Sequence, residues 1–230
     1  MSDSDLSIAT TTAIERVSRS LNDFLHSDER AVQLLAEPTL PDASGFQDAA
    51  THAIAIGGMP ELRLEKRRRL LQIAALDASG RLSLEEIGRA LSDLADACLR
   101  ATLIHIEAPE GLSVVAMGKL GARELNYFSD IDVMFVATGN SGGATKAVET
   151  LLAELGGNSP EGQAYVIDAN LRPQGRSGAL VRSLDAFLEY YGRWAESWEF
   201  QALRLGFGYV GFGSEYCNYY CNRTCEWQPE

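Results

Sequence analysis

The chain has 230 residues, 46% of them hydrophobic, so it is long enough to bury one full core and a smaller second one. Its 32 acidic and 20 basic residues give a formal charge of −12, which disfavours a sequence-independent grip on nucleic acid phosphates. The first residues are acidic and polar, and no later apolar run has the length of a membrane span. We therefore expect a cytoplasmic protein with neither a nucleic-acid partner nor a membrane partner.

Helical patterns dominate the first hundred residues. Apolar side chains recur at helical spacing in two short stretches within residues 14–35, and then along a longer segment, residues 61–77. A capping box formed by Ser83 and Glu86 predicts the start of another helix, which continues to about Ile106. We expect residues 1–108 to form a helical N-terminal region.

Two features of these helices have alternative interpretations. One side of segment 61–77 is basic, and we interpret it as a solvated helix face rather than as a docking surface for an acidic partner. The basic residues on it are Arg63, Lys66, Arg67, Arg68 and Arg69. Cys98 lies on the apolar stripe of the following helix, so we expect a core residue rather than a nucleophile or a metal ligand.

From residue 109 onward, short β-rich runs replace the helical patterns. We expect strands at Leu112–Met117, Ile131–Ala137 and Ala164–Leu171, with helices at 120–127 and 145–155 between them. A last, aromatic-rich helix is predicted from Ser183 through Ala202. This order predicts an α+β fold in which a helical N-terminal region precedes a small mixed sheet and a long C-terminal helix. We place the catalytic core at residues 109–203.

The pattern Asp-Ile-Asp at residues 130–132 is the centre of the functional prediction. Residues two apart on a strand point to the same face, so Asp130 and Asp132 present two carboxylates side by side while Ile131 enters the core. A third acid, Asp168, interrupts an apolar run, where an unpaired carboxylate is rare. Because neighbouring carboxylates repel each other without a cation, we expect all three acids to be metal ligands and catalytic residues. Hard oxygen ligands of this kind suit Mg²⁺ or Mn²⁺.

Phosphate-binding candidates occur on both sides of these acids. A glycine-bearing turn with a lysine lies between the first strand and the next helix, where backbone N–H groups can face an anion. A serine hydroxyl comes just before the acid pair, and two arginines with forked donors follow the third acid in the loop LRPQGRSG. The residues that we expect to bind phosphate are Gly118, Lys119, Ser129, Arg172 and Arg176.

Each of these features has an ordinary structural explanation by itself. An Asp-x-Asp pair is usually a solvated turn, glycines near strand ends usually form turns, and an inward-facing Asp can cap a neighbouring loop. Their order along the chain is much more specific. A Gly-Lys turn, an acid pair, a third acid and an arginine loop in succession favour in-line phosphoryl transfer.

The chain resembles a known family in three segments, GKLGARELNYFSDIDVMF, DANLRPQGRSGALVRS and YYGRWAESWEFQAL. In order and spacing they are similar to the signature segments of bacterial glutamine synthetase adenylyltransferase, also called the adenylyl-removing enzyme. The resemblance is strong from about Leu64 to Leu203, and it implies a nucleotidyltransferase core of the DNA polymerase β type. Family members have two related catalytic halves, and this chain has room for one. Asn126 and the WEFQAL segment look more like the N-terminal, adenylyl-removing half.

The resemblance implies that the chain moves AMP to or from a tyrosine of glutamine synthetase and thereby regulates nitrogen assimilation. The implied cofactor is Mg²⁺, with ATP as substrate in one direction and ADP as product in the other. In the family motifs, Asp130 and Asp132 match the metal-binding pair and Asp168 matches the third acid. Phosphate contacts are implied for Lys119, Arg172 and Arg176, and a helical signature, whose role we interpret as packing, for Trp198, Glu199 and Gln201. The implied partners are glutamine synthetase and the PII signal protein.

The sequence departs from the family pattern in two regions. Gly118-Lys119 stands where the superfamily usually has Gly-Ser or Gly-Gly, and Ala122 stands where a second glycine is common. After Leu203 the chain continues with an atypical tail, residues 204–230, rich in glycine, tyrosine and cysteine. We interpret this tail as the product of a frameshift or a truncated reading frame. The alternative is a metal site at Cys217, Cys221 and Cys225, for which no fourth ligand lies nearby.

Three functional hypotheses follow. The first is an active Mg²⁺-dependent enzyme that acts on glutamine synthetase, and the second is an inactive truncated fragment that binds nucleotide or glutamine synthetase without turnover. The third is a nucleotidyltransferase with another substrate. Three mutually repelling acids argue against a binding-only module. Matches away from the acids, such as RRRLLQIAALD, argue against an unrelated substrate.

Overall fold

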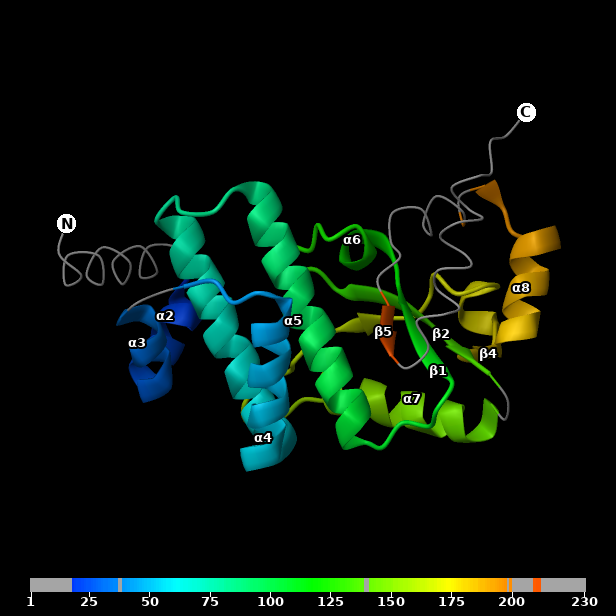
Figure 1. Ribbon diagram of the computed structural model, residues 1–230, viewed down its shortest axis with the longest axis horizontal. Coiled ribbons are helices and arrows are strands. Elements are labelled where there is room, and N and C mark those ends of the chain that lie inside the picture. The colour runs from blue at the N-terminus through cyan, green and yellow to red at the C-terminus, as the bar shows by residue number, and fades with distance from the viewer. Residues whose placement is uncertain (1–17, 37–38, 139–140, 198, 200–208, 212–230) are drawn as a thin grey trace.

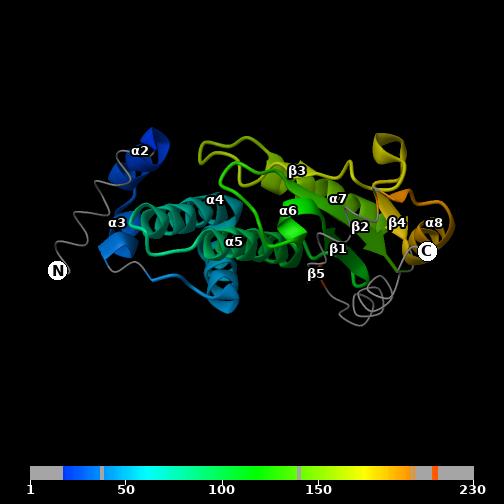
Figure 2. The ribbon, with the colours of Figure 1, turned by 90° about the horizontal axis from the view of Figure 1, so that it is seen from above.

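A computed structural model of the chain describes residues 18–36, 39–138, 141–197, 199 and 209–211. The first helices occupy one end of an elongated molecule, and the strands with their covering helices occupy the other (Figures 1 and 2). Predictions that concern Trp198, Gln201 and the three tail cysteines lie outside the described residues. No helix in the described part of the chain is both long and apolar enough to cross a membrane.

The helical end consists of two short and two long helices. These are α2 (Arg19–Ser27), α3 (Glu29–Ala36), α4 (Ala43–Ala78) and α5 (Leu84–His105). Helix α4 is kinked at Gly58, whose φ of 64° is not helical, and Pro60 follows without a backbone donor. The predicted capping box of α5 is confirmed, because Ser83 Oγ accepts from Glu86 N–H and a Glu86 carboxylate oxygen accepts from Ser83 N–H.

A small mixed sheet forms the other end. Its described strands are β1 (Leu112–Ala116), β2 (Ile131–Ala137), β3 (Ile167–Asp168), β4 (Val181–Ser183) and β5 (Tyr209–Gly211). Strand β1 is antiparallel to both β2 and β5, and β2 is parallel to β3 near its start and to β4 near its end. The third predicted strand is shortened to β3, and β4 was not predicted. One part of the predicted atypical tail, β5, is hydrogen-bonded to β1 within the sheet.

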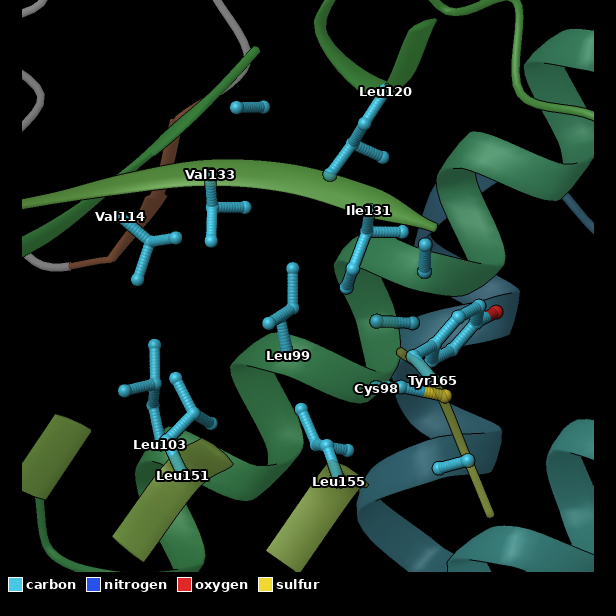
Figure 3. Packing of buried hydrophobic residues seen from close by; sticks show 14 of the residues in the cluster. Cys98, Leu99, Leu103, Val114, Leu120, Ile131, Val133, Leu151, Leu155 and Tyr165 are labelled. Atoms are coloured by element: carbon cyan, nitrogen blue, oxygen red, sulfur yellow. The ribbon is translucent and has the colours of Figure 1, made fainter. Parts of the chain in front are cut away.

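Helices cover both faces of this sheet. Ile131 and Val133 point to the face covered by α5 and by α7 (Ser141–Gly156), where they pack with Leu99 and Leu151 (Figure 3). Alternate residues of β2 point to the other face, where Met134 packs against α8 (Leu184–Arg193). The short helix α6 (Gly118–Gly121) connects β1 to the loop that leads into β2.

The predicted α+β fold is confirmed. Cys98 is fully buried, and desolvation raises the pKa of its thiol to about 12, which agrees with the expected core role. The last helix is shorter than expected, because α8 ends at Arg193 and the backbone turns at Trp194. The predicted boundary near residue 108 falls between α5 and β1, although one core of buried residues crosses it. The division into domains therefore stays a prediction.

The interpretation of the basic stretch on α4 as a solvated face is wrong for Arg63 and Arg68. Arg68 is 4% exposed and lies within 2.7 Å of Asp28, 2.6 Å of Glu61 and 3.2 Å of Glu65. Arg63 is also buried, and it donates to the backbone oxygen of Glu154 on α7. A charge withdrawn from water needs such partners, so these arginines hold α4 to its neighbours instead of facing solvent.

The buried arginine cluster generates a stability prediction. Replacing Arg68 by Met should lower the free energy of unfolding by about 3 kcal/mol, because it leaves partly buried carboxylates without their cation. The matched control is Arg89→Met, since Arg89 forms an exposed ion pair with Glu85 at 2.9 Å, and the expected loss is below about 0.5 kcal/mol. Urea denaturation measures both losses, and similar losses in the two variants would contradict the structural role of Arg68.

Candidate active site

The acid pair lies at the start of β2. Ile131 N–H donates to Val166 O at 3.0 Å, and Met117 N–H donates to Asp132 O at 2.8 Å, so neighbouring strands hold this end of β2 on both sides. Ile131 is fully buried as predicted, whereas Asp132 points to the opposite face and is half-buried. Asp130 precedes the strand and is exposed. The two carboxylates thus stand at a strand end, where side chains are accessible.

Asp168 lies beside Asp132 because β2 and β3 are parallel. The register pairs Ile131 with Ile167 and Asp132 with Asp168. Paired residues on adjacent strands project to the same face of a sheet, so the two carboxylates occupy neighbouring positions on one face. Asp168 Oδ1 also accepts a hydrogen bond of 2.7 Å from the Asn170 N–H, which orients the side chain. Two acids that are 36 positions apart in sequence are therefore neighbours in the sheet.

Neighbouring charges act on the carboxyl group of Asp132. Burial, followed by the negative charges of Asp168 and Asp130, raises the pKa of Asp132 above its ordinary value, and the Lys119 ammonium opposes this rise. Within the described ranges, however, no three Asp, Glu, His or Cys side chains are grouped closely enough to hold a metal ion. The three-carboxylate metal site therefore stays a prediction. The structure adds that the negative charges of Asp168 and Asp130 act on Asp132.

The Gly-Lys turn lies directly against Asp132. Gly118 begins α6 with a φ of 51°, a conformation that residues with a Cβ rarely adopt. A Cβ at this position would lie 2.7 Å from Asp132 Oδ2, so a side chain here would displace the carboxylate. Lys119 is exposed and close enough for its charge to act on Asp132. The turn therefore brings a cation and a closely approaching backbone to the acids.

Ser129 belongs to a tight turn just before the acid pair. Its N–H donates to Asn126 O at 3.2 Å, and its Oγ accepts from the Asn126 N–H at 3.4 Å. Asn126 Oδ1 in turn accepts a hydrogen bond of 3.0 Å from the Phe128 N–H. These bonds give Asn126 and Ser129 a role in shaping the turn. Phosphate binding by Ser129 stays a prediction.

The two loop arginines have different surroundings. Arg172 donates through Nε to Gly178 O, through Nη1 to Ala169 O and through Nη2 to Arg176 O, so its fork holds the loop together. Arg176 is exposed, and its Nε donates to Asn170 Oδ1 at 3.3 Å. Asn170 thus contacts both Asp168 and Arg176. As placed, Arg176 is the better candidate for a phosphate contact.

Sequence reasoning missed the residues that anchor the loop between α6 and β2 to the helices. Arg123 forms ion pairs with Asp93 and Asp96 of α5, and Tyr127 OH donates to Asp77 Oδ2 of α4 at 2.9 Å. Leu125 N–H also donates to Ser92 Oγ of α5 at 3.4 Å. These partners lie about thirty or more positions away in the sequence, so no local pattern identifies them. The anchors position the loop that ends at Asp130.

The predicted helical signature near the end of the described chain is represented by Glu199 alone. Glu199 is 3% exposed, and both of its carboxylate oxygens accept hydrogen bonds from Tyr190 OH, at 3.0 and 3.1 Å. One of them also accepts from the Glu196 N–H at 2.8 Å. The contacts of Glu199 agree with the predicted packing role.

Comparisons with known proteins agree with this arrangement. A protein called bifunctional glutamine synthetase adenylyltransferase/adenylyl-removing enzyme is 44% identical in Streptomyces avermitilis over 173 residues, covering 67% of this chain and 17% of the relative. The protein of that name from Corynebacterium glutamicum is 50% identical over 137 residues, covering 55% and 13%. The one from Mycobacterium avium is 40% identical over 214 residues, covering 84% and 21%. The chain therefore spans about a fifth or less of the length of these relatives.

A family model described as glutamate-ammonia ligase adenylyltransferase matches residues 12–206. This match includes the helical layer, α6, the acid pair, Asp168 and the arginine loop, so every part of the candidate site lies within it. The chain belongs to the glutamate-ammonia ligase adenylyltransferase family.

Proposed function

We propose that this chain carries a nucleotidyl-transfer centre that moves AMP to or from a tyrosine of glutamine synthetase with Mg²⁺. The observation that carries the proposal is the pairing of Asp132 with Asp168, beside Asp130 and against the Gly118–Lys119 turn. Family membership supports the transfer of adenylyl groups, and the relatives are named for glutamine synthetase. The direction of transfer, the PII partner and a cytoplasmic location belong to the same proposal.

The donor set of the site fits a divalent cation. The three aspartates offer hard oxygen ligands, and the raised pKa of Asp132, caused by burial and then by the charges of Asp168 and Asp130, indicates uncompensated negative charge. When bound, the cation would neutralise phosphate oxygens and make the phosphorus more electrophilic. Asp130, Asp132 and Asp168 would hold it, and Lys119 and Arg176 would orient the phosphates.

The chain's own residues act by position and charge. In the removing direction, an oxygen of inorganic phosphate forms a bond to the AMP phosphorus while the bond to the tyrosine oxygen breaks, which yields ADP and the free tyrosine side chain. In the attaching direction, the tyrosine oxygen bonds to the α-phosphorus of ATP and pyrophosphate leaves. The same aspartates serve both directions, because charge develops on the same phosphoryl oxygens. The resemblance of the sequence around Asn126 to the adenylyl-removing half of the family favours the removing direction.

An inactive fragment that binds nucleotide or glutamine synthetase without turnover is the alternative. The short span of this chain relative to the full-length proteins favours it. The pairing of Asp132 with Asp168 favours activity, since like charges at paired positions cost stability and are typical of a functional site. Turnover measurements separate the two.

The first test is an activity assay. The chain is incubated with adenylylated glutamine synthetase, Mg²⁺ and phosphate, and ADP is measured. The Asp130→Asn variant should lose activity by about 100-fold or more, because it removes a charge that would hold the metal. Equal ADP production by both proteins would refute the role of Asp130, and nucleotide binding without ADP from the unchanged chain would favour the inactive fragment.

The repulsion among the acids generates a second test. Because its pKa is raised, Asp132 binds a proton more readily in the folded than in the unfolded chain, so its charge lowers stability increasingly as the pH rises through that window. The Asp132→Asn variant should therefore have a higher melting temperature than the unchanged chain at pH 7 without metal. Mg²⁺ should raise the melting temperature of the unchanged chain much more than that of the variant. An equal response of the two proteins to Mg²⁺ would count against metal binding at Asp132.

The close approach of Gly118 to Asp132 generates a third test. The Gly118→Ala variant should lose about 1–2 kcal/mol of stability, because a Cβ is strained at this φ, and it should lose at least about tenfold in activity. Gly143 in α7 is the matched control, since a Cβ there meets no atom within 4 Å. Thermal melts and the ADP assay compare the variants. A Gly118→Ala variant with full activity would contradict the need for this close approach.

A further inference from the structure

Lys66 differs from the arginines around it on α4. Arg68 and Arg69 pair with carboxylates, and the Arg67 guanidinium lies 4.2 Å from the ring centre of Phe24. The Lys66 Nζ lies 4.7 Å from the ring centre of Tyr165, and among the described residues no carboxylate lies within 4 Å of it. Contact with a ring face stabilises an ammonium but leaves its three N–H donors without acceptors. Lys66 is therefore a cation without an anionic partner.

This ammonium lines a pocket of about 200 Å³ between α4 and the loop before β2. Polar residues line the other walls, namely Asn126, Ser129, Asp130 and Gln163, beside Tyr127 and Tyr165. Figure 3 shows Tyr165 against Cys98, at the edge of the shared core, so one wall of the pocket belongs to a packed part of the molecule. Amides and a hydroxyl next to a cation are the groups that bind oxyanions.

The size and charge of the pocket restrict its ligand. Pockets for nucleotides or drug-sized molecules are usually about 300–1,000 Å³, so this one suits a smaller group. Asp130 is the only carboxylate among the lining residues, and Lys66 is the only cation. An anion near Lys66 is attracted by the ammonium and repelled by Asp130, so the two residues should have opposite effects on its affinity.

We propose that this pocket binds a small oxyanion, with the Lys66 ammonium as the principal contact and Asn126, Ser129 and Gln163 as neutral hydrogen-bonding groups. The ligand chemistry is an anionic oxygen group of the size of inorganic phosphate or of a carboxylate. The pocket adjoins the candidate active site, because Ser129 and Asp130 line it, whereas neither residue of the Gly118–Lys119 turn does. Anion binding at this pocket can be measured without AMP transfer, so a failure of the proposed transfer and a failure of anion binding are distinguishable.

The test is direct binding to the full chain by isothermal titration calorimetry, with inorganic phosphate as one probe and acetate as the other. The Lys66→Met variant should bind the preferred probe at least about tenfold more weakly, because a charge-assisted contact is lost. The Lys66→Arg variant should retain binding, and Asp130→Asn should strengthen it severalfold. The preferred probe distinguishes a phosphate site from a carboxylate site.

The matched control is Arg67→Met, which removes a cation at the next position of the same helix that also contacts a ring but does not line the pocket. It should leave the affinity unchanged, and circular dichroism confirms that each variant is folded. Three outcomes would overturn the proposal. These are no binding of either probe, equal losses in Lys66→Met and Arg67→Met, and a loss confined to a Lys119→Met variant, which would place the anion at the Gly-Lys turn.

Discussion

The candidate site depends on the parallel register between β2 and β3. This pairing sets Asp132 directly beside Asp168, and it places like charges on one face of the sheet. Burial and these neighbouring charges raise the pKa of Asp132, so the arrangement costs stability in the absence of a cation. The close backbone at Gly118 fits only because this residue has no Cβ. A close backbone approach that only glycine permits and repelling charges at one place are typical of a functional site.

The helical layer contributes to this site through the loop that enters β2. Arg123 and Tyr127 tie that loop to Asp93, Asp96 and Asp77 on the two long helices, and a core of buried residues continues from the helices into the sheet. A change in the packing of α4 or α5 would therefore shift Asp130. The family match covers these helices as well as strands β1 to β4.

Two cations of α4, Arg68 and Lys66, have different surroundings. On α4, Arg68 neutralises carboxylates from α3's N-terminal side and from its own helix, so the basic stretch stabilises the fold. Two positions before Arg68, Lys66 faces a pocket instead and has no carboxylate partner among the described residues. Two cations two positions apart on one helix thus have separate roles, because the helix turns them toward different neighbours.

The sequence by itself determined the fold class, the capping box of α5, the burial of Ile131 and Cys98, and the positions of β1 and β2. These follow from local patterns, because helical and strand periodicities and caps depend on residues that are close in sequence. Only the tertiary structure decided that Asp168 pairs with Asp132, that Arg172 holds its own loop and that Arg63 and Arg68 of α4 are buried. It also decided that β4 joins β2 and that α8 ends at Arg193. Partners such as Arg123 and Asp93 are distant in the chain, and a charged side chain looks the same in a sequence whether it faces water or a partner. Their contacts follow from how the layers pack, which no local pattern encodes.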